Sequence, residues 1–241
     1  MGSNQGVWDI ADVISASRMN RKTLIGDTGA NLSALGTTYA GQLAFCTTTG
    51  SGFTIEQLYQ RNSGNTAWVA LSVSGLQDVW VPCTAMWARA TTGAGGLTRT
   101  ELATNKINIQ TFDFDTTTQE FIQFCWQPPR NWNNGTIKFT PYWTAASGSG
   151  TFISDLKGGA FSNDDALDTA LGTLQSSTDT LITANDLHIG PQSAAITITG
   201  TPADSDLIFF QVDRDVADTL GVDALLIGIT LEITIDSSVA A

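Results

Sequence analysis

Hydrophobic and polar positions alternate with a period of two over the stretch 120–144, which predicts β-strands on either side of a break. Pro128-Pro129 cannot donate to a ladder, and Asn134-Gly135 accepts the positive φ of a tight turn. The pattern therefore predicts an antiparallel pair that carries four large aromatic side chains inward. The apolar positions of the two runs are Ile122, Phe124, Trp126, Ile137, Phe139, Pro141 and Trp143.

The same alternation recurs through the C-terminal part of the chain. Strands are predicted around 78–87, with Pro82 marking an edge or an end, and over 106–114, 194–199, 207–213 and 224–236. The last of these is expected to present one aliphatic face to a core: Leu225, Ile227, Ile229, Leu231, Ile233 and Ile235. Apolar residues at helical spacing after Asn163 predict one short helix over 164–174. Many short strands with turn residues between them favour an all-β, jelly-roll-like antiparallel β-sandwich over 76–241.

The N-terminal part follows a different pattern. The first forty residues hold short apolar pieces spaced by glycines, and they are predicted to be an irregular arm or docking segment (1–40). Three short alternating runs follow, with turn residues in both gaps, and predict a small β-meander module (41–75). A meander of this size has few core residues, so we expect it to pack on something else.

Charge changes the picture mainly after residue 150. The chain has 11 basic and 23 acidic residues, and the net charge of −12 lies entirely beyond that point, where Lys157 and Arg214 stand among fourteen acids. This composition disfavours binding to nucleic acid and favours a solvated acidic exterior, with bound cations as the alternative. The one basic cluster, Arg18, Arg21 and Lys22, is either a solvated loop or a contact with an acidic partner.

Cysteine usage and hydropathy indicate a cytoplasmic origin without a membrane anchor. Cys46, Cys83 and Cys125 are far apart, odd in number and without a CxxC motif, which favours reduced, buried side chains over disulfides or a zinc site. The N-terminus lacks the apolar region of a signal peptide, and no apolar run approaches the length of a membrane span.

Candidate chemistry is sparse. The single histidine, His188, is expected to be structural, and no serine lies in a Gly-x-Ser-x-Gly setting, so we predict no catalytic residues and no cofactor. No EF-hand loop exists and no metal site is predicted, although loop calcium is left open by closely spaced acids. These acids are Asp204, Asp206, Asp213, Asp215 and Asp218. Trp132, in a turn with Asn133 and Asn134, is the tryptophan expected nearest the surface and a candidate for stacking on a sugar.

Several motifs carry a family resemblance. WVPCTAM at Trp80–Met86, FDFD, the P-x-x-W-N turn at Pro129–Asn133, GTIKFTPYW, and FFQVDRDVADTLGVDALLIGITL at Phe209–Leu231 resemble virion-associated proteins of tailed bacteriophages, over about Val79–Asp236. The run from Gly41 to Leu71 is similar to small hairpin modules of phage fibres and head-decorating proteins. The resemblance implies a non-enzymatic virion structural protein, assembled in the host cytoplasm and placed on the virion surface.

Two functions follow from that resemblance. The first is a capsid decoration, cement or head-fibre protein that docks through its N-terminal region, with a homotrimer and the major capsid protein as partners. The alternative is a receptor- or glycan-binding fibre domain, in which loops that include Trp132–Asn134 bind host carbohydrate. Neither function involves nucleic acid or a membrane.

Overall fold

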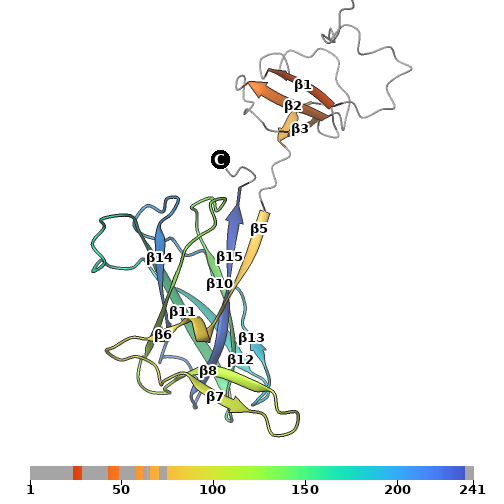
Figure 1. The fold of residues 1–241 in the computed structure, drawn as a ribbon. Coiled ribbons are helices and arrows are strands. Elements are labelled where there is room, and N and C mark those ends of the chain that lie inside the picture. The colour runs from red at the N-terminus through yellow and green to blue at the C-terminus, as the bar shows by residue number, and fades with distance from the viewer. Residues whose placement is uncertain are drawn as a thin grey trace, which may run out of the picture. The chain divides into compact units, whose positions relative to one another are not determined.

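The structure is a computed structural model of the 241-residue chain. It describes residues 24–28, 43–48, 58–61, 64, 66–70 and 75–236. The chain divides into two compact units, Met1–Val73 and Ser74–Ala241, and each is described by itself. Its described elements are strands joined by turns and one 3-10 turn (Figure 1). Within these residues no helix is long and apolar enough to cross a membrane.

The first unit holds one small sheet. Its strands are β1 (Leu24–Thr28), β2 (Leu43–Thr48), β3 (Leu58–Arg61) and β4 (Trp68–Ala70), and they lie in this order. The neighbours β2, β3 and β4 pair antiparallel, as the predicted meander requires. However, β1 pairs parallel with β2 and lies inside the segment predicted to be an irregular arm, so that prediction is wrong for residues 24–28.

The second unit contains two facing sheets. Its strands are β5 (Gly75–Pro82), β6 (Trp87–Ala88), β7 (Thr98–Glu101), β8 (Asn108–Phe114), β9 (Phe121–Trp126), β10 (Lys138–Thr144), β11 (Gly150–Phe161), β12 (Gln175–Leu181), β13 (His188–Ile189), β14 (Leu207–Arg214) and β15 (Ala224–Ile235), with the 3-10 turn η3 (Cys83–Ala85) after β5. One sheet has the order β13-β10-β15-β8-β7, with β5 also paired to β15, and the other has the order β12-β11-β14-β9-β6.

The pairings define a jelly roll. Counted from β8, the chain places β8, β10, β13 and β15 in one sheet and β9, β11, β12 and β14 in the other. The antiparallel ladders β8-β15-β10-β13 and β9-β14-β11-β12 are the two four-stranded halves of that fold. The all-β, jelly-roll sandwich predicted from the sequence is therefore confirmed, and β5 ends at Pro82 as expected.

The predicted hairpin over 120–144 is wrong. The two aromatic runs form β9 and β10, and these strands lie in opposite sheets. The connecting segment crosses between the sheets, with Asn134 in the left-handed region at φ 55°. Three of the four aromatic side chains predicted to face inward, Phe124, Phe139 and Trp143, are fully or almost fully buried, and the fourth, Trp126, is partly buried against the core. Periodicity identifies which side chains face a core, but not which strand pairs with which.

The last strand also departs from a uniform alternation. Leu226 pairs opposite Trp143 and Gly228 opposite Tyr142, so Ile227 is an extra residue on β15 relative to β10. This β-bulge reverses the faces of the strand. Ala224 and Leu226 are buried before the bulge, and Ile229, Leu231 and Ile233 are buried after it. Leu225 and Ile227 therefore do not share the core face predicted for them.

The short helix predicted over 164–174 is absent, and the segment is a loop. Its backbone bonds to other elements instead of to itself: Gly172 N donates to Gly158 O over 3.1 Å. A Cβ at Gly172 would lie 2.7 Å from Thr197 O, so this close approach needs glycine. Residues 194–199 likewise form isolated bridges rather than the predicted strand, although Ile196 and Ile198 are buried.

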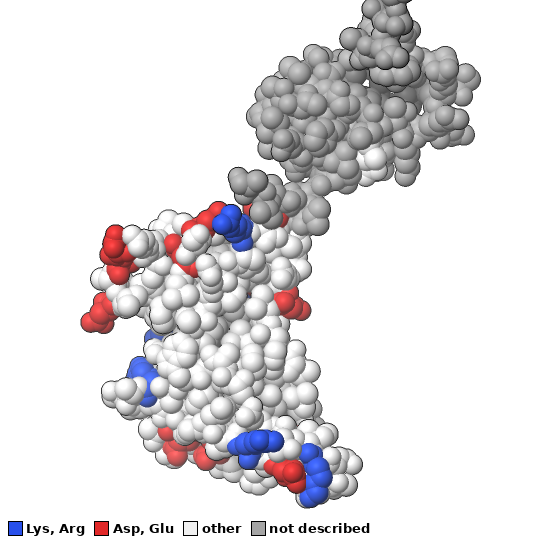
Figure 2. Space-filling view, in the orientation of Figure 1, with Lys and Arg blue, Asp and Glu red and all other residues white. Residues whose placement is uncertain are grey.

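A buried ion pair joins the end of β14 to the loop that follows it. Arg214, which is fully buried, donates from Nε to Asp218 Oδ2 over 2.9 Å and from Nη2 to Asp218 Oδ1 over 2.8 Å. Its remaining donors bond the carbonyl oxygens of Phe114, Leu220 and Val222. Figure 2 shows one face of the molecule, on which charged side chains lie mainly toward the ends of this unit.

His188 is structural, as expected. Its ring is 6% exposed, lies 4.9 Å from the ring of Trp143, and bonds through Nε2 with Thr183 O over 3.0 Å. Trp143 is fully buried and donates from Nε1 to Asp179 Oδ2 over 2.9 Å. The core between the sheets is therefore built around Trp143 and its neighbours.

Candidate functional site

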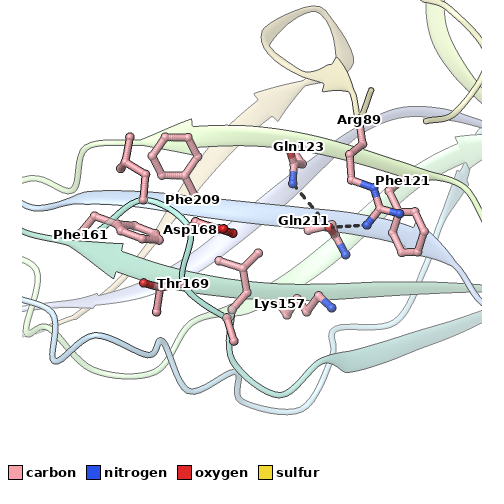
Figure 3. A pocket seen from close by; sticks show the side chains of 12 residues that line it. Arg89, Phe121, Gln123, Lys157, Phe161, Asp168, Thr169, Phe209 and Gln211 are labelled. Atoms are coloured by element: carbon pink, nitrogen blue, oxygen red, sulfur yellow. Dashed lines mark hydrogen bonds between the residues drawn. The ribbon is translucent and has the colours of Figure 1, made fainter. Parts of the chain in front are cut away.

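An open cleft of about 580 Å³ lies over the outer face of the sheet β12-β11-β14-β9-β6. Strands β9, β11 and β14 form its floor, and the segments that follow β6 and β11 form its sides (Figure 3). Its volume is in the range of about 300–1,000 Å³ that is usual for small-molecule sites. Lining residues are Arg89, Phe121, Gln123, Lys157, Phe161, Leu167, Asp168, Thr169, Ala170, Leu171, Phe209 and Gln211.

Strand periodicity places the floor residues on one face. On β14, Phe210 and Val212 point into the core, so Phe209 and Gln211 point outward. The ladder then aligns Lys157 of β11 with Gln211 and Gln211 with Gln123 of β9. A row of one ammonium and two amide side chains therefore crosses the sheet, one strand apart at each step.

Arg89 is oriented above this row. Its guanidinium carbon lies 3.7 Å from the centre of the Phe121 ring, within cation–π distance. Nε donates to Thr91 O over 2.7 Å, and Nη2 donates to Thr92 Oγ1 over 2.6 Å. Nη1 reaches Gln211 Oε1 at 3.4 Å, where Gln123 Nε2 also donates at 3.5 Å. Both bonds to Gln211 are long, so this oxygen is weakly held.

The other end of the cleft is apolar. Phe161 and Phe209 meet edge to face, with their ring centres 5.5 Å apart. Gly159 has no side chain, and Leu171 packs over this position of the sheet. Leu171 Cδ2 lies 3.1 Å from the place that a Cβ at 159 would take. Leu167, in the same loop, is 72% exposed. The floor of the cleft thus combines aromatic rings at one end with hydrogen-bonding side chains at the other.

Two acids lie in the same sheet face, next to the cleft. Asp155 and Asp213 are direct cross-strand partners, and both are buried. Burial raises the pKa of Asp155 to about 6, and the Asp213 charge adds to this, while a hydrogen bond with Ser176 and the Lys157 charge oppose it. Burial also raises the pKa of Asp213, while the hydrogen bond that Gln119 Nε2 donates to Asp213 Oδ2 over 2.7 Å lowers it. Neither carboxyl lines the cleft.

Trp132 does not lie at the surface, so the expectation of an exposed stacking ring is wrong. Its side chain is 3% exposed and packs edge to face on Trp126, with ring centres 5.7 Å apart. The turn is fastened to the end of β15, because Asn133 N donates to Thr234 O over 3.0 Å and Trp132 bridges Ile235. The turn therefore closes one end of the core.

Asn133 and Asn134, the other described residues predicted to contact a glycan, lie in the turn and not in the cleft. Asn133 is exposed, but its Oδ1 accepts from Gly135 N over 2.9 Å, and Asn134 serves the turn through its positive φ. Arg18, Arg21 and Lys22 lie outside the described residues. Of the described candidate contact residues, Trp132, Asn133 and Asn134, none lines the cleft.

Four of the five acids left open for calcium, Asp206, Asp213, Asp215 and Asp218, have internal partners. Asp206 accepts from Ser162 Oγ over 2.7 Å and from Ala203 N over 2.8 Å, and Asp218 pairs with Arg214. Asp215 Oδ1 accepts from Ala217 N over 2.8 Å. In the described part of the chain no group of three or more His, Cys, Asp or Glu side chains could hold a metal ion.

Comparison with known proteins identifies no family. No protein-family model and no curated protein matches the chain. Among solved structures, it is similar to a carbohydrate-binding module, TmCBM61, in complex with beta-1,4-galactotriose (12% identity, 65% of this chain and 86% of that chain, TM-score 0.31). It is also similar to a carbohydrate-binding module specific for non-crystalline cellulose, CBM28 (14% identity, 64% of this chain and 87% of that chain, TM-score 0.35). A putative glycoside hydrolase from Bacteroides thetaiotaomicron also matches (12% identity, 80% of this chain and 72% of that chain, TM-score 0.29). At these identities and TM-scores, the likenesses assign neither a family nor a ligand.

Proposed function

We propose that the unit Ser74–Ala241 is a non-enzymatic carbohydrate-binding domain, with its ligand in the cleft over β9, β11 and β14. The observation that carries the proposal is the presence of aromatic rings and amide side chains together on the floor of one open cleft. A sugar has apolar C–H faces, which pack on Phe161 and Phe209, and hydroxyl groups that both donate and accept. The side chains of Gln123 and Gln211 also both donate and accept, so they match hydroxyl groups.

The arrangement of carboxyls supports binding without hydrolysis. Glycosidases act with a pair of carboxyl groups that flank the scissile bond. Among the described residues that line the cleft, Asp168 is the one carboxylate. The pair with raised pKa values, Asp155 and Asp213, is buried in the sheet and not open to a substrate. We therefore propose a lectin-like domain, which binds a carbohydrate without hydrolysing it.

Binding is tested by titrating the full chain, in a calorimeter, with a panel of soluble neutral and acidic polysaccharides. Phe209→Ala and Gln211→Ala should each weaken binding by about tenfold or more, because each removes a contact in the cleft. Gln110→Ala is the matched control, since Gln110 is exposed on β8 and outside the cleft. If no glycan of the panel binds, or if Gln110→Ala weakens binding as much as Gln211→Ala, the proposal is wrong.

The virion role is a second proposal, supported by the sequence resemblance over about Val79–Asp236. In the fold, its motifs form structural features: Trp132 closes one end of the core, and the buried pair of Arg214 with Asp218 joins the end of β14 to the loop that follows it. The resemblance therefore supports a shared jelly roll. We propose that this domain is displayed by a tailed-phage particle, as a fibre-like glycan-binding domain or as a capsid decoration.

Immunogold labelling of intact virions with antibody to residues 80–241 separates these two locations. Label over the head supports the decoration or head-fibre role, with the major capsid protein as partner. Label at the tail tip supports the fibre role. Absence of label from a particle that carries the gene product in its lysate removes the virion proposal and leaves carbohydrate binding to be judged by titration.

A further inference from the structure

The cations of the second unit are unevenly paired. Residues 75–236 contain seven Lys and Arg, five before residue 150 and two after it, against nineteen acids, five before and fourteen after. Three of the seven are in ion pairs: Lys106 with Glu101, Lys138 with Glu232 and Arg214 with Asp218. In a unit with this excess of acids, a cation without a carboxylate partner is unexpected and requires a reason.

Two of the four remaining cations line the cleft. Arg89 comes from the segment after β6 and Lys157 from β11, so the fold brings together charges that lie far apart in the sequence. Within the described residues, neither side chain has a carboxylate within 4.0 Å. Arg99 and Arg130, which are also outside ion pairs, do not line the cleft.

Arg89 is held so that its charge faces the cleft. The Phe121 ring and the neutral oxygens of Thr91, Thr92 and Gln211 fix the plane of the guanidinium without neutralising it. Figure 3 shows this guanidinium between Phe121 and Gln211. A planar guanidinium presents paired N–H donors that match the oxygens of a carboxylate or sulfate. The long bond to Gln211 is the one that an incoming anion can replace.

The charge of Lys157 also has an electrostatic role within the sheet. Its charge acts on the buried Asp155 and Asp213 and lowers the pKa of each. Arg89 shares part of this role, because its charge also lowers the pKa of Asp213 from the other end of the row Lys157-Gln211-Gln123. Arg89 points to the ligand through its geometry, because its guanidinium is fixed against Phe121 in the cleft and has no carboxylate of the described residues within 4.0 Å. Lys157 adds to the positive potential of the floor.

We propose that the cleft selects a sugar bearing an anionic group, a carboxylate or a sulfate, and that Arg89 binds this group. The inference rests on carbohydrate binding in the cleft as the proposed function. The negative charge of the whole unit does not oppose it strongly, because salt at physiological strength screens exposed charges beyond about 8 Å. Within the cleft, Arg89 and Lys157 outnumber the one lining carboxylate, Asp168, so the charge of the lining is net positive.

The test compares matched ligands on the full chain by calorimetric titration. Polygalacturonate is compared with its fully methyl-esterified form, and dextran sulfate with dextran, so that each pair differs in charge. Binding to one charged member should exceed binding to its neutral counterpart by about tenfold or more and weaken as salt rises. The pair that responds tells whether the anionic group is a carboxylate or a sulfate.

Variants locate the effect. Arg89→Gln should remove most of the preference for the charged member, whereas Arg99→Gln, which changes the same charge on β7, should leave it within about twofold. Circular dichroism melting checks that Arg89→Gln is folded. Lys157→Gln is a second variant, which removes the other positive charge from the same cleft. Equal binding of charged and neutral members overturns the anionic preference and leaves carbohydrate binding intact. A chain that binds no sugar, charged or neutral, overturns both.

Discussion

The buried ion pair gives a sharp prediction about stability. Asp218→Asn keeps the size of the side chain and removes its charge, so Arg214 remains fully buried without a counter-ion. The carboxylate accepts four hydrogen bonds, two from Arg214 and one each from Ile153 N and Leu220 N, and an amide cannot accept all of them. Removing one partner of a buried pair typically costs about 3–5 kcal/mol, and we expect a loss of free energy of unfolding in that range.

The guanidinium cannot relieve the loss by turning outward, because its other donors are bonded to the carbonyl oxygens of Phe114, Leu220 and Val222. Urea unfolding followed by tryptophan fluorescence suits the measurement. Five of the seven tryptophans, Trp80, Trp87, Trp126, Trp132 and Trp143, belong to this unit. With a slope of about 2 kcal/mol per molar urea, the midpoint should fall by roughly 2 M.

Glu101→Gln is the control, since Glu101 and Lys106 form an exposed ion pair with side chains 51% and 67% exposed. Such pairs contribute about 0–1 kcal/mol, and salt screens them. A loss of unfolding free energy below about 1 kcal/mol for Asp218→Asn, or one no larger than the loss for Glu101→Gln, would refute this prediction. It is also refuted if added salt restores the stability of Asp218→Asn, because a fully buried charge is poorly screened.

Two further predictions concern groups near the site and the core. The pKa of Asp155 is about 6 in the folded chain, above its ordinary value of 3.8, so folding binds a proton between these values. The wild type should therefore gain stability relative to Asp155→Asn as pH falls from about 7 to about 4, in urea unfolding at each pH, and a constant difference would contradict this. Trp132→Ala should cost about 3–5 kcal/mol of unfolding free energy, because a large buried ring leaves a cavity, while glycan affinity of the folded variant stays unchanged. A variant with native stability that loses glycan binding would show that the ring is a contact after all.

The parts of the fold that the sequence predicts are those with strong alternation. Strands β9, β10, β14 and β15 each carry large side chains on one face, and the period of two is visible in the letters. Strands β11 and β12 are not predicted, because they consist mainly of small and polar residues and take their ladder bonds from β14 and from each other. Their strand structure depends on partners distant in the sequence.

Local signals also fail where tertiary contacts decide the conformation. The loop 162–174 has an N-cap, acids and apolar spacing typical of a helix, yet Gly172 bonds to β11 and Leu171 covers Gly159. In the same way, the Pro-Pro and Asn-Gly break has the residues of a hairpin, but it crosses between sheets because the core lies between β9 and β10. Neither outcome can be read from spacing alone.

The candidate site is hidden from the sequence for a related reason. Gln123, Lys157 and Gln211 lie on strands in which polar and apolar residues alternate, and they occupy polar positions. Any strand with one exposed face carries polar residues at such positions. They become a row only through the pairing of β11 with β14 and of β14 with β9. Arg89 follows a strand of two residues and gives no periodic signal. A surface tryptophan is the more obvious candidate, and at Trp132 that choice is wrong.

The central claim is that a carbohydrate binds over the outer face of β9, β11 and β14. The most direct measurement is a crystal structure of the full chain with the oligosaccharide that titrates most tightly. The account predicts a sugar ring packed on Phe209 or Phe161, with its hydroxyls bonded to Gln123 and Gln211. A sugar bound elsewhere, such as on the half-exposed Trp80 of the opposite sheet, with the cleft holding only water, would contradict it.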